Sequence, residues 1–337
     1  MPENRRFILA ARPTGDPRPG DFELRREPTP DLAEGQFLIR NHYASLDPAM
    51  RGWMDDLPSY MPPIPLGTPV RASTIGVVEQ SRAEGFKPGQ WVMGLNAIEE
   101  YSIGATGGFT QPIDAAAVPN VTNYLSLYGA VGMTAYFGLI EVCEPIEGDT
   151  VLVTGAAGAV GSLVGQIARI KGCRVIGIAG GPEKCARLTQ RYGFDAAIDY
   201  RGKDVDALTE AIRVQAPGGL DVIFENVGGD ILDAGLNNLR NGARIGLCGL
   251  ISEYNSTTRI GARNLWQLIV HRASIRGLLV ADYIPRFGEG GAQMAQWASA
   301  GKIVVDEHVD EGIENAYSAF MRLFEGTNQG KMILKLA

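Results

Sequence analysis

The segment 149–161 begins with a short apolar, β-branched run and ends in three regularly spaced glycines, Gly155, Gly158 and Gly161. A helical pattern follows over 162–171. In such a motif the first glycine permits a tight turn, the second lets backbone approach a pyrophosphate, and the third lets helix and strand pack closely. The start of the helix would then offer unpaired N–H groups and a positive dipole end to phosphates. Glycines at this spacing also occur in ordinary turns, but the flanking strand and helix patterns favour a dinucleotide site.

The next apolar run, residues 173–179, predicts the second strand of this βαβ unit. An NAD site usually has a carboxylate at the end of this strand, to bind the ribose 2′-hydroxyl. Here the strand ends at Gly180, which we assign to the cofactor site, and Lys184 and Arg187 follow on the next predicted helix. Glu183 is interpreted as a residue of the first helical turn. The pattern favours NADP over NAD; the alternative is that both cations belong to a solvated helix face.

The composition is that of a globular enzyme with two domains. The chain has 337 residues, 45% of them hydrophobic and 20% charged, and a net charge of −7. We find no basic stripe for nucleic acid and no apolar run long enough to cross a membrane. The first residues lack the apolar core of a signal peptide, so the predicted location is cytoplasmic. The predicted partner is a small-molecule substrate.

The four cysteines contain no C-x-x-C pair, and the three histidines contain no H-x-x-x-H pair. Neither a structural zinc site nor a thioredoxin-like motif is therefore indicated. We predict that the protein binds no metal.

Sequence patterns change near residue 125. The first 120 or so residues combine short alternating segments with Pro/Gly-rich turns, which favours an antiparallel barrel or sandwich. Strand-like and helical runs then alternate, which favours a doubly wound parallel sheet. A last helix over 313–324 and a last strand over 331–335 are expected to return to the first domain. We therefore predict a discontinuous domain, 1–124 with 306–337, for substrate and catalysis, a Rossmann domain over 125–305 for NADP, and a ligand cleft between them. The strands expected in the Rossmann domain are 151–153, 175–178, 196–198, 222–224, 243–248 and 275–279.

Six motifs along nearly the whole chain carry a family resemblance: 46–52, 132–136, 156–161, 224–229, 248–255 and 328–331. Together they resemble the zinc-independent medium-chain dehydrogenase/reductases, in particular the prostaglandin, alkenal double-bond and bacterial curcumin reductases. The resemblance implies a Rossmann domain beside a GroES-like, mainly antiparallel barrel domain. It also implies NADPH-dependent reduction of the C=C bond of α,β-unsaturated ketones and aldehydes. The Gly-His-Glu motif and four-cysteine lobe of the zinc-binding members are absent from the sequence.

The resemblance also assigns individual residues. Lys184 would bind the 2′-phosphate, and Tyr200 would contact the adenosine phosphate. The other implied contacts are Gly158, Ala159 and Val160 around the pyrophosphate, Met133 and Thr134 lining the nicotinamide pocket, Asn226 and Cys248 flanking the nicotinamide half, and Asn328 closing over it.

Two positions depart from the family pattern. Ala49 stands where the family usually has tyrosine, which enlarges or reshapes the substrate pocket. Arg71 stands where the family often has small residues; it is interpreted as a surface residue, and contact with an acidic substrate is the alternative.

The expected chemistry is hydride transfer to the β-carbon, with charge developing on the carbonyl oxygen as an enolate. Tyr254 matches the family's active-site tyrosine and is the preferred hydrogen-bond donor to that oxygen; the alternative is that it only walls the pocket. Tyr60 is the second candidate. The proton for the α-carbon comes from Tyr254 or from water, which the sequence does not decide.

Two other functions stay open at this stage: a quinone oxidoreductase of the same superfamily, and a non-catalytic NADPH-binding protein. The apolar pattern of residues 274–280 predicts a sheet edge that pairs in a homodimer, and the resemblance implies the same assembly.

Overall fold

The computed structural model describes residues 2–258 and 260–337. They form two compact units: a first unit of Met1–Leu125 with Glu307–Ala337, and a second unit of Ser126–Asp306. The second unit contains a parallel sheet, and the first contains a mostly antiparallel sheet. The predicted fold class is therefore confirmed, whereas the roles assigned to the two domains stay predictions.

The sheet of the second unit has six parallel strands. They are β8 (Thr150–Val153), β9 (Arg174–Ala179), β10 (Ala196–Asp199), β11 (Leu220–Glu225), β12 (Leu239–Leu247) and β13 (Ser274–Gly277). Their order in space is β10-β9-β8-β11-β12-β13, so the chain builds outward from β8 in one direction and then from β11 in the other. The strand order thus reverses between β8 and β11, and in sheets of this kind ligands bind beyond the carboxyl ends of the strands at that point.

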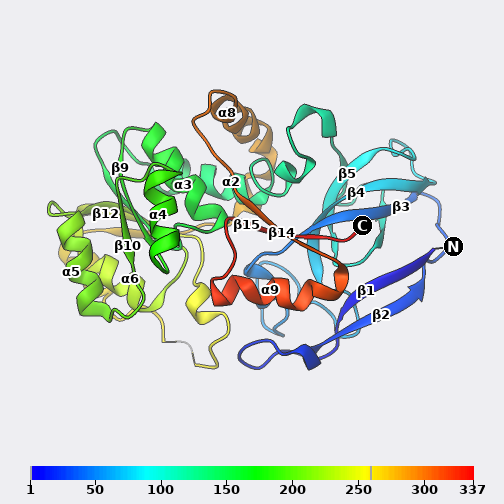
Figure 1. Cartoon of the computed structure of the whole chain (residues 1–337), viewed down its shortest axis with the longest axis horizontal. Coiled ribbons are helices and arrows are strands. Elements are labelled where there is room, and N and C mark those ends of the chain that lie inside the picture. Colours follow the sequence, from blue (N-terminus) through cyan, green and yellow to red (C-terminus); the bar gives the residue numbers. More distant parts are fainter. Residues whose placement is uncertain (1, 259) are drawn as a thin grey trace. The chain divides into compact units, whose positions relative to one another are not determined.

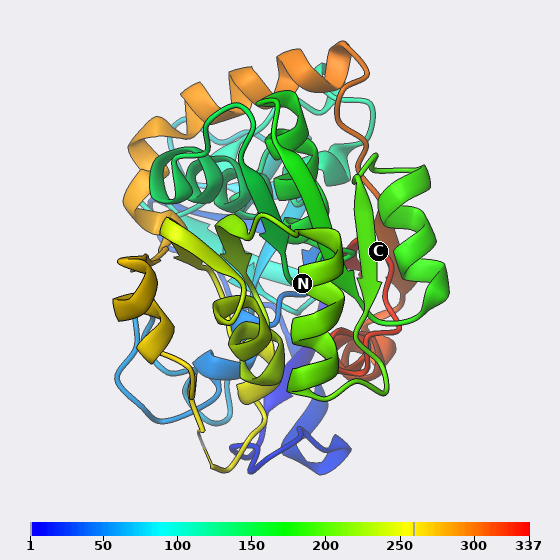
Figure 2. The same cartoon turned by 90° about the vertical axis from the view of Figure 1, so that its left-hand side faces the viewer.

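Helices cover both faces of this sheet (Figure 2). They are α2 (Ala130–Phe137), which continues into a π-helical segment (Gly138–Cys143), α3 (Ala159–Ile170), α4 (Pro182–Gln190), α5 (Val205–Gln215), α6 (Gly229–Leu236), α7 (Trp266–His271) and α8 (Phe287–Ser299). The sheet has one hydrophobic core on each face, because successive side chains of a strand point to opposite faces. Val151 and Val153 pack with residues of α2 and α3, whereas Leu152 packs with residues of α5 and α6.

The predicted elements of this unit form with shifted ends. The helix expected over 162–171 begins at Ala159, because Gly158 already has extended backbone and serves as its N-cap. The last strand, expected over 275–279, spans Ser274–Gly277.

The first unit contains a seven-stranded sheet and a separate two-stranded hairpin (blue in Figure 1). Its elements are β1 (Glu3–Leu9), β2 (Phe22–Pro28), β3 (Gln36–Ser45), α1 (Ala49–Trp53), β4 (Arg71–Ser81), β5 (Trp91–Ala97), β6 (Tyr101–Ala105), β7 (Gln111–Pro112), β14 (Glu307–Glu311), α9 (Ala316–Glu325) and β15 (Lys331–Lys335). The strand order is β14-β15-β3-β4-β5-β7, and β6 pairs with β3. The last strand, β15, thus returns to the first unit as expected, pairing with β3.

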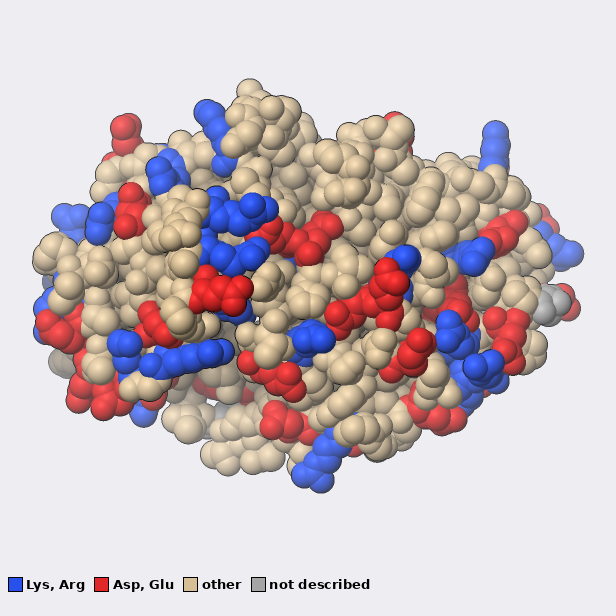
Figure 3. Space-filling view, viewed as in Figure 1, with Lys and Arg blue, Asp and Glu red and all other residues tan. Residues whose placement is uncertain are grey.

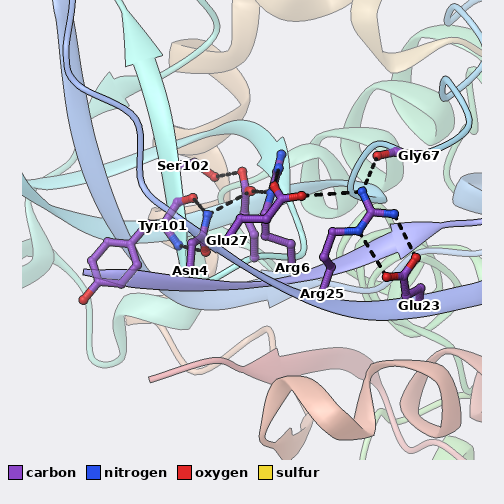
Figure 4. A network of polar contacts seen from close by, with 9 residues as sticks. Asn4, Arg6, Glu23, Arg25, Glu27, Gly67, Tyr101 and Ser102 are labelled. Atoms are coloured by element: carbon purple, nitrogen blue, oxygen red, sulfur yellow. Dashed lines mark hydrogen bonds and ion pairs between the residues drawn. The ribbon is translucent and has the colours of Figure 1, made fainter. Parts of the chain in front are cut away.

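A buried polar network ties the β1–β2 hairpin to the segment before β6 (Figure 4). Its centre is Glu99, whose Oε2 accepts hydrogen bonds from Arg6 Nε at 2.9 Å and Asn4 Nδ2 at 3.3 Å. Its Oε1 accepts one from Ser102 Oγ at 2.8 Å. Burial raises the pKa of Glu99, although these donors oppose the shift.

Acidic and basic side chains are interspersed over the face shown in Figure 3. Among the described residues, no helix combines the length and the apolar character needed to span a membrane.

Candidate functional site

The glycine motif forms a tight turn between β8 and α3. Gly155 has a φ of +58°, which favours glycine, and the Gly158 N–H donates to the Gly155 carbonyl at 3.0 Å. A Cβ on Gly161 would lie 2.5 Å from that same carbonyl oxygen, so the third glycine permits the close approach of helix and strand. No side chain caps α3 at Gly158, so N–H groups of its first turn are available to an anion.

This packing predicts the effect of a single methyl group. Gly161→Ala would force the turn and the helix apart, so we expect it to lower the free energy of unfolding by about 1–3 kcal/mol. Gly291→Ala is the matched control, because a Cβ on that α8 residue meets no atom within 4 Å. Thermal unfolding should show a lower Tm for the first variant only; equal Tm values would contradict the packing argument.

The segment after β9 is shaped by two glycines and by residues that follow β10. A Cβ on Gly180 would lie 3.1 Å from Tyr200 Oη and 3.2 Å from Arg201 Nε. Gly181 has a φ of +92°, and a Cβ there would lie 3.1 Å from Arg201 Nη1. The positive φ of Gly181 favours glycine, and the lack of a Cβ at both positions lets the phenol and the guanidinium lie close to this backbone. The structure thereby brings together two predicted residues, Gly180 and Tyr200, with one that the sequence analysis missed, Arg201.

Lys184 and Arg201 are neighbouring cations. Burial, and then the charge of Arg201, lower the pKa of Lys184. Among the residues that the structure describes, neither ammonium nor guanidinium forms an ion pair of 4 Å or less. Two neighbouring positive charges, one of them half-buried, are costly unless an anion joins them, so this cluster has the character of a phosphate site.

Arg187, the other cation predicted on this helix, is engaged elsewhere. Its Nη2 lies 2.5 Å from Asp306, which also binds Arg191 and accepts a hydrogen bond from Tyr192 Oη at 2.5 Å. Desolvation opposes these contacts, yet they hold the pKa of Asp306 at about 2. Arg187 is therefore paired with a carboxylate within the second unit.

The carboxylate of Asp199, at the end of β10, is bonded to the segment that follows β9. Asp199 Oδ1 accepts hydrogen bonds from the N–H groups of Gly181 at 2.8 Å and Arg201 at 3.0 Å. Desolvation raises the pKa of Asp199, but these two bonds and nearby cations outweigh it and lower the pKa overall. Asp199 thus fixes the backbone that carries the two cations.

The segments after β8, β11 and β12 meet where the strand order reverses. Asn226 Nδ2 donates to the Thr154 carbonyl at 2.7 Å, and the N–H of Cys248 donates to the Glu225 carbonyl at 2.9 Å. Asn226 and Cys248, both predicted to flank the nicotinamide, therefore follow neighbouring strands joined by these bonds. Burial raises the pKa of the Cys248 thiol to about 12, so this side chain is a neutral thiol near pH 7.

Tyr254 follows a 3₁₀ turn, Ile251–Glu253, and folds back over the segment after β12. Its Oη accepts a hydrogen bond from the Leu250 N–H at 3.2 Å, and a Cβ on Gly249 would lie 3.0 Å from that oxygen. The phenol is half-buried. The structure thus places the predicted catalytic hydroxyl next to the segment that carries Cys248.

The two residues predicted to line the nicotinamide pocket from α2 lie differently. Met133 is fully buried in the core, and a Cβ on Gly290 of α8 would lie 2.7 Å from its sulfur. Thr134 is half-buried, and its hydroxyl donates to the Ala130 carbonyl at 2.7 Å.

Three side chains of the first unit form a cluster near α1. Trp53 Nε1 donates to Tyr60 Oη at 3.3 Å, and the guanidinium of Arg71 lies 5.9 Å from the centre of the Trp53 ring. Arg71 also donates to the Pro62 carbonyl at 2.9 Å, and burial lowers its pKa. Arg71 is therefore half-buried and tied to the segment that carries Tyr60.

The other predicted residues of this unit lie near β15 and α1. Asn328 is 8% exposed, and its Nδ2 donates to the Gly330 carbonyl at 3.0 Å. The buried Lys331 donates from Nζ to the Leu46 carbonyl at 2.7 Å and to Asp47 Oδ1 at 2.9 Å. These two hydrogen bonds fix the segment between β3 and α1, which precedes Ala49.

No cluster of three or more His, Cys, Asp or Glu side chains suited to a metal ion occurs within residues 2–258 and 260–337. Metal independence stays a prediction. We expect activity to survive dialysis against EDTA, and elemental analysis to find no stoichiometric zinc. Stoichiometric zinc together with loss of turnover on chelation would contradict it.

Comparison with known proteins places this chain in a family. Residues 5–111 match a family model described as the N-terminal domain of oxidoreductase, and residues 159–297 match one described as zinc-binding dehydrogenase. The NADPH-dependent curcumin reductase of Escherichia coli is 38% identical, with 99% of this chain and 97% of that protein covered. The NADP(+)-dependent 2-alkenal reductase of Nicotiana tabacum is also 38% identical, with 99% and 98% covered. The crystal structure of CurA from Vibrio vulnificus in complex with NADPH is 41% identical, covers 99% of both chains and has a TM-score of 0.93. The chain therefore belongs to the zinc-independent branch of the medium-chain dehydrogenase/reductases.

Proposed function

We propose that this protein is an NADPH-dependent reductase that saturates the C=C bond of α,β-unsaturated ketones and aldehydes. Two of the relatives named above are named as NADP-dependent reductases, one of curcumin and one of 2-alkenals, and the similar solved structure is a complex with NADPH. The observation that carries the cofactor assignment is the cluster of Lys184 and Arg201 beside Tyr200. It suits the 2′-phosphate that distinguishes NADPH from NADH.

Each part of the second unit has a role in this proposal. Lys184, Tyr200 and Arg201 bind the 2′-phosphate, next to Gly180. The uncapped start of α3, with Gly158, Ala159, Val160 and Gly161, binds the pyrophosphate after the turn at Gly155. Asn226, Cys248 and Thr134 contact the nicotinamide half in this proposal. The contacts of Asn328 and of Met133, whose side chain is fully buried, stay expectations from the sequence.

Bound NADPH supplies a hydride to the β-carbon of the substrate. The protein must then stabilise the negative charge that develops on the carbonyl oxygen. A phenol can donate a hydrogen bond to that oxygen while it remains neutral at pH 7, and Tyr254 is the residue we assign to this step. Tyr60 is the second candidate.

The substrate side belongs to the first unit in this proposal. Trp53 and Tyr60 offer aromatic surface, and Ala49 supplies only a methyl group. These residues suit a substrate with an apolar or aromatic body next to its enone.

The test is NADPH oxidation with three substrate classes of graded size: enals, enones and quinones. The proposal expects turnover of enals or enones to exceed that of quinones of similar size. Turnover of quinones alone would favour a quinone oxidoreductase, and tight NADPH binding without turnover of any class would favour a non-catalytic function.

We also propose that the chain forms a homodimer through the β13 edge of its parallel sheet. Among the described residues, strand β13 pairs only with β12, and the helix that precedes it exposes large apolar side chains. Trp266 is 68% exposed and Ile269 is 66% exposed. Exposed apolar sheet edges are normally covered or paired, and a second copy of this chain is the partner that we propose here.

Light scattering at micromolar concentration should give the mass of two chains. The double variant Trp266→Glu/Ile269→Glu should give the mass of one chain, since it places charges on the proposed interface. A single-chain mass for the wild-type protein would contradict the proposal.

A further inference from the structure

A fully buried carboxylate, that of Glu225, lies at the point where the strand order of the parallel sheet reverses. Glu225 ends β11 and is 0% exposed. Its Oε1 accepts three hydrogen bonds: from Thr154 Oγ1 at 3.0 Å, from the Val227 N–H at 2.6 Å and from the Gly228 N–H at 2.7 Å. Its Oε2 has no hydrogen-bond partner among the described residues.

These bonds join segments that follow two neighbouring strands. Thr154 follows β8, whereas Val227 and Gly228 form the turn between β11 and α6. The Thr154 hydroxyl also accepts a hydrogen bond from the Asn226 N–H at 2.8 Å, so the Glu225 carboxylate orients this hydroxyl and, through it, Asn226. The carboxylate thus determines how the two segments meet.

Main-chain atoms of Glu225 add a third segment. Its carbonyl accepts hydrogen bonds from the N–H groups of Cys248 at 2.9 Å and Gly249 at 3.1 Å, just after β12. One residue therefore contacts the ends of β8, β11 and β12, and the predicted nicotinamide residues Asn226 and Cys248 lie on two of these segments.

The carboxylate is held there at an energetic cost. Burial raises the pKa of Glu225 to about 6, although its hydrogen-bond donors, among them Gly228, Val227 and Thr154, lower it. The Cys248 thiol is a titratable neighbour, and burial raises its pKa to about 12, so it stays neutral and supplies no counter-ion. A buried charge that is held by donors alone is expected where it fixes a functional geometry.

We propose that Glu225 is a positioning residue for the nicotinamide half of the cofactor, acting through Thr154 and the turn at Val227 and Gly228. This inference rests on the proposed NADPH-dependent function. It predicts that loss of the carboxylate charge weakens contacts to the nicotinamide half and leaves the 2′-phosphate site unaffected. That site is formed by Lys184, Tyr200 and Arg201, none of which is bonded to Glu225.

The variant Glu225→Gln tests this, because its amide oxygen can still accept hydrogen bonds but carries no charge. Two probes are compared by calorimetry: NADPH and adenosine 2′,5′-bisphosphate, which has the 2′-phosphate but no nicotinamide. We expect the Kd for NADPH to rise about tenfold, as for loss of a charge-assisted contact, with the Kd for the bisphosphate within twofold of wild type. Equal changes for both probes, or no change for NADPH, would overturn the proposal.

Two further variants keep the test decisive. If Glu225→Gln does not fold, Thr154→Val removes the bridging hydroxyl and should show the same selective loss of NADPH affinity. Glu99→Gln neutralises another buried glutamate, which belongs to the network of Figure 4 in the first unit, and should leave both Kd values unchanged. A wild-type protein that does not bind NADPH would refute the proposed function itself. Wild-type affinity for NADPH in Glu225→Gln, or in Thr154→Val where Glu225→Gln does not fold, would refute only this inference.

Discussion

Tyr254→Phe should lower kcat and kcat/KM together, by roughly 10- to 1000-fold, because a hydrogen bond to the developing enolate is strongest in the transition state. The Leu250 N–H binds the Tyr254 oxygen at 3.2 Å. The phenyl ring retains the packing of the tyrosine, so the Kd for NADPH should stay within about twofold of wild type.

The measurement is steady-state turnover of a small enone, with NADPH deuterated at the transferred position to show whether hydride transfer limits the rate. Tyr60→Phe is the matched control, since it removes a phenol from the first unit that accepts a hydrogen bond from Trp53. If Tyr254→Phe retains wild-type turnover while hydride transfer limits the rate, Tyr254 only walls the pocket. A large loss in Tyr60→Phe instead would transfer the role to Tyr60.

Lys184→Ala should reduce kcat/KM for NADPH by roughly 10- to 100-fold, mostly through KM, since a charge-assisted contact to phosphate contributes about 1.5–3 kcal/mol. Arg201→Ala should act in the same direction, because both cations lack a carboxylate partner among the described residues. Use of NADH, which has no 2′-phosphate, should change little in either variant.

Arg187→Ala is the control for these two variants. Arg187 lies on the same helix as Lys184, but its guanidinium is paired with Asp306. We expect it to leave the preference for NADPH over NADH unchanged. Equal use of the two cofactors by the wild-type protein, or an unchanged preference in Lys184→Ala, would contradict the assignment of the phosphate site.

The sequence predicted the features that depend on local pattern. The glycine spacing predicted the turn between β8 and α3. The positive φ of Gly155 favours glycine, and the close approach of helix and strand at Gly161 leaves no room for a Cβ. The alternation of strands and helices likewise predicted the parallel sheet, since the period of apolar residues differs between the two elements. Helix ends were less predictable: α3 starts three residues early because Gly158, not a polar side chain, is its N-cap.

Residues that act across strands were missed. Asp199 ends β10 and Arg201 follows it, yet both lie against the glycines after β9, a relation that depends on strand order rather than on sequence spacing. Glu225 stands inside a recognised motif, but only the structure shows that its carboxylate bonds to Thr154 on the neighbouring strand. The available signal for Arg201 was its position directly after Tyr200, at the end of the third strand of the βαβαβ unit.

The central claim is that the protein transfers a hydride from NADPH to the β-carbon of an enone. The most direct measurement is product analysis by mass spectrometry and NMR after turnover with NADPH deuterated at the transferred position. The account predicts a saturated ketone with one deuterium at the β-carbon and the carbonyl intact. An allylic alcohol with deuterium on the carbinol carbon, or a saturated product without deuterium at the β-carbon, would contradict it.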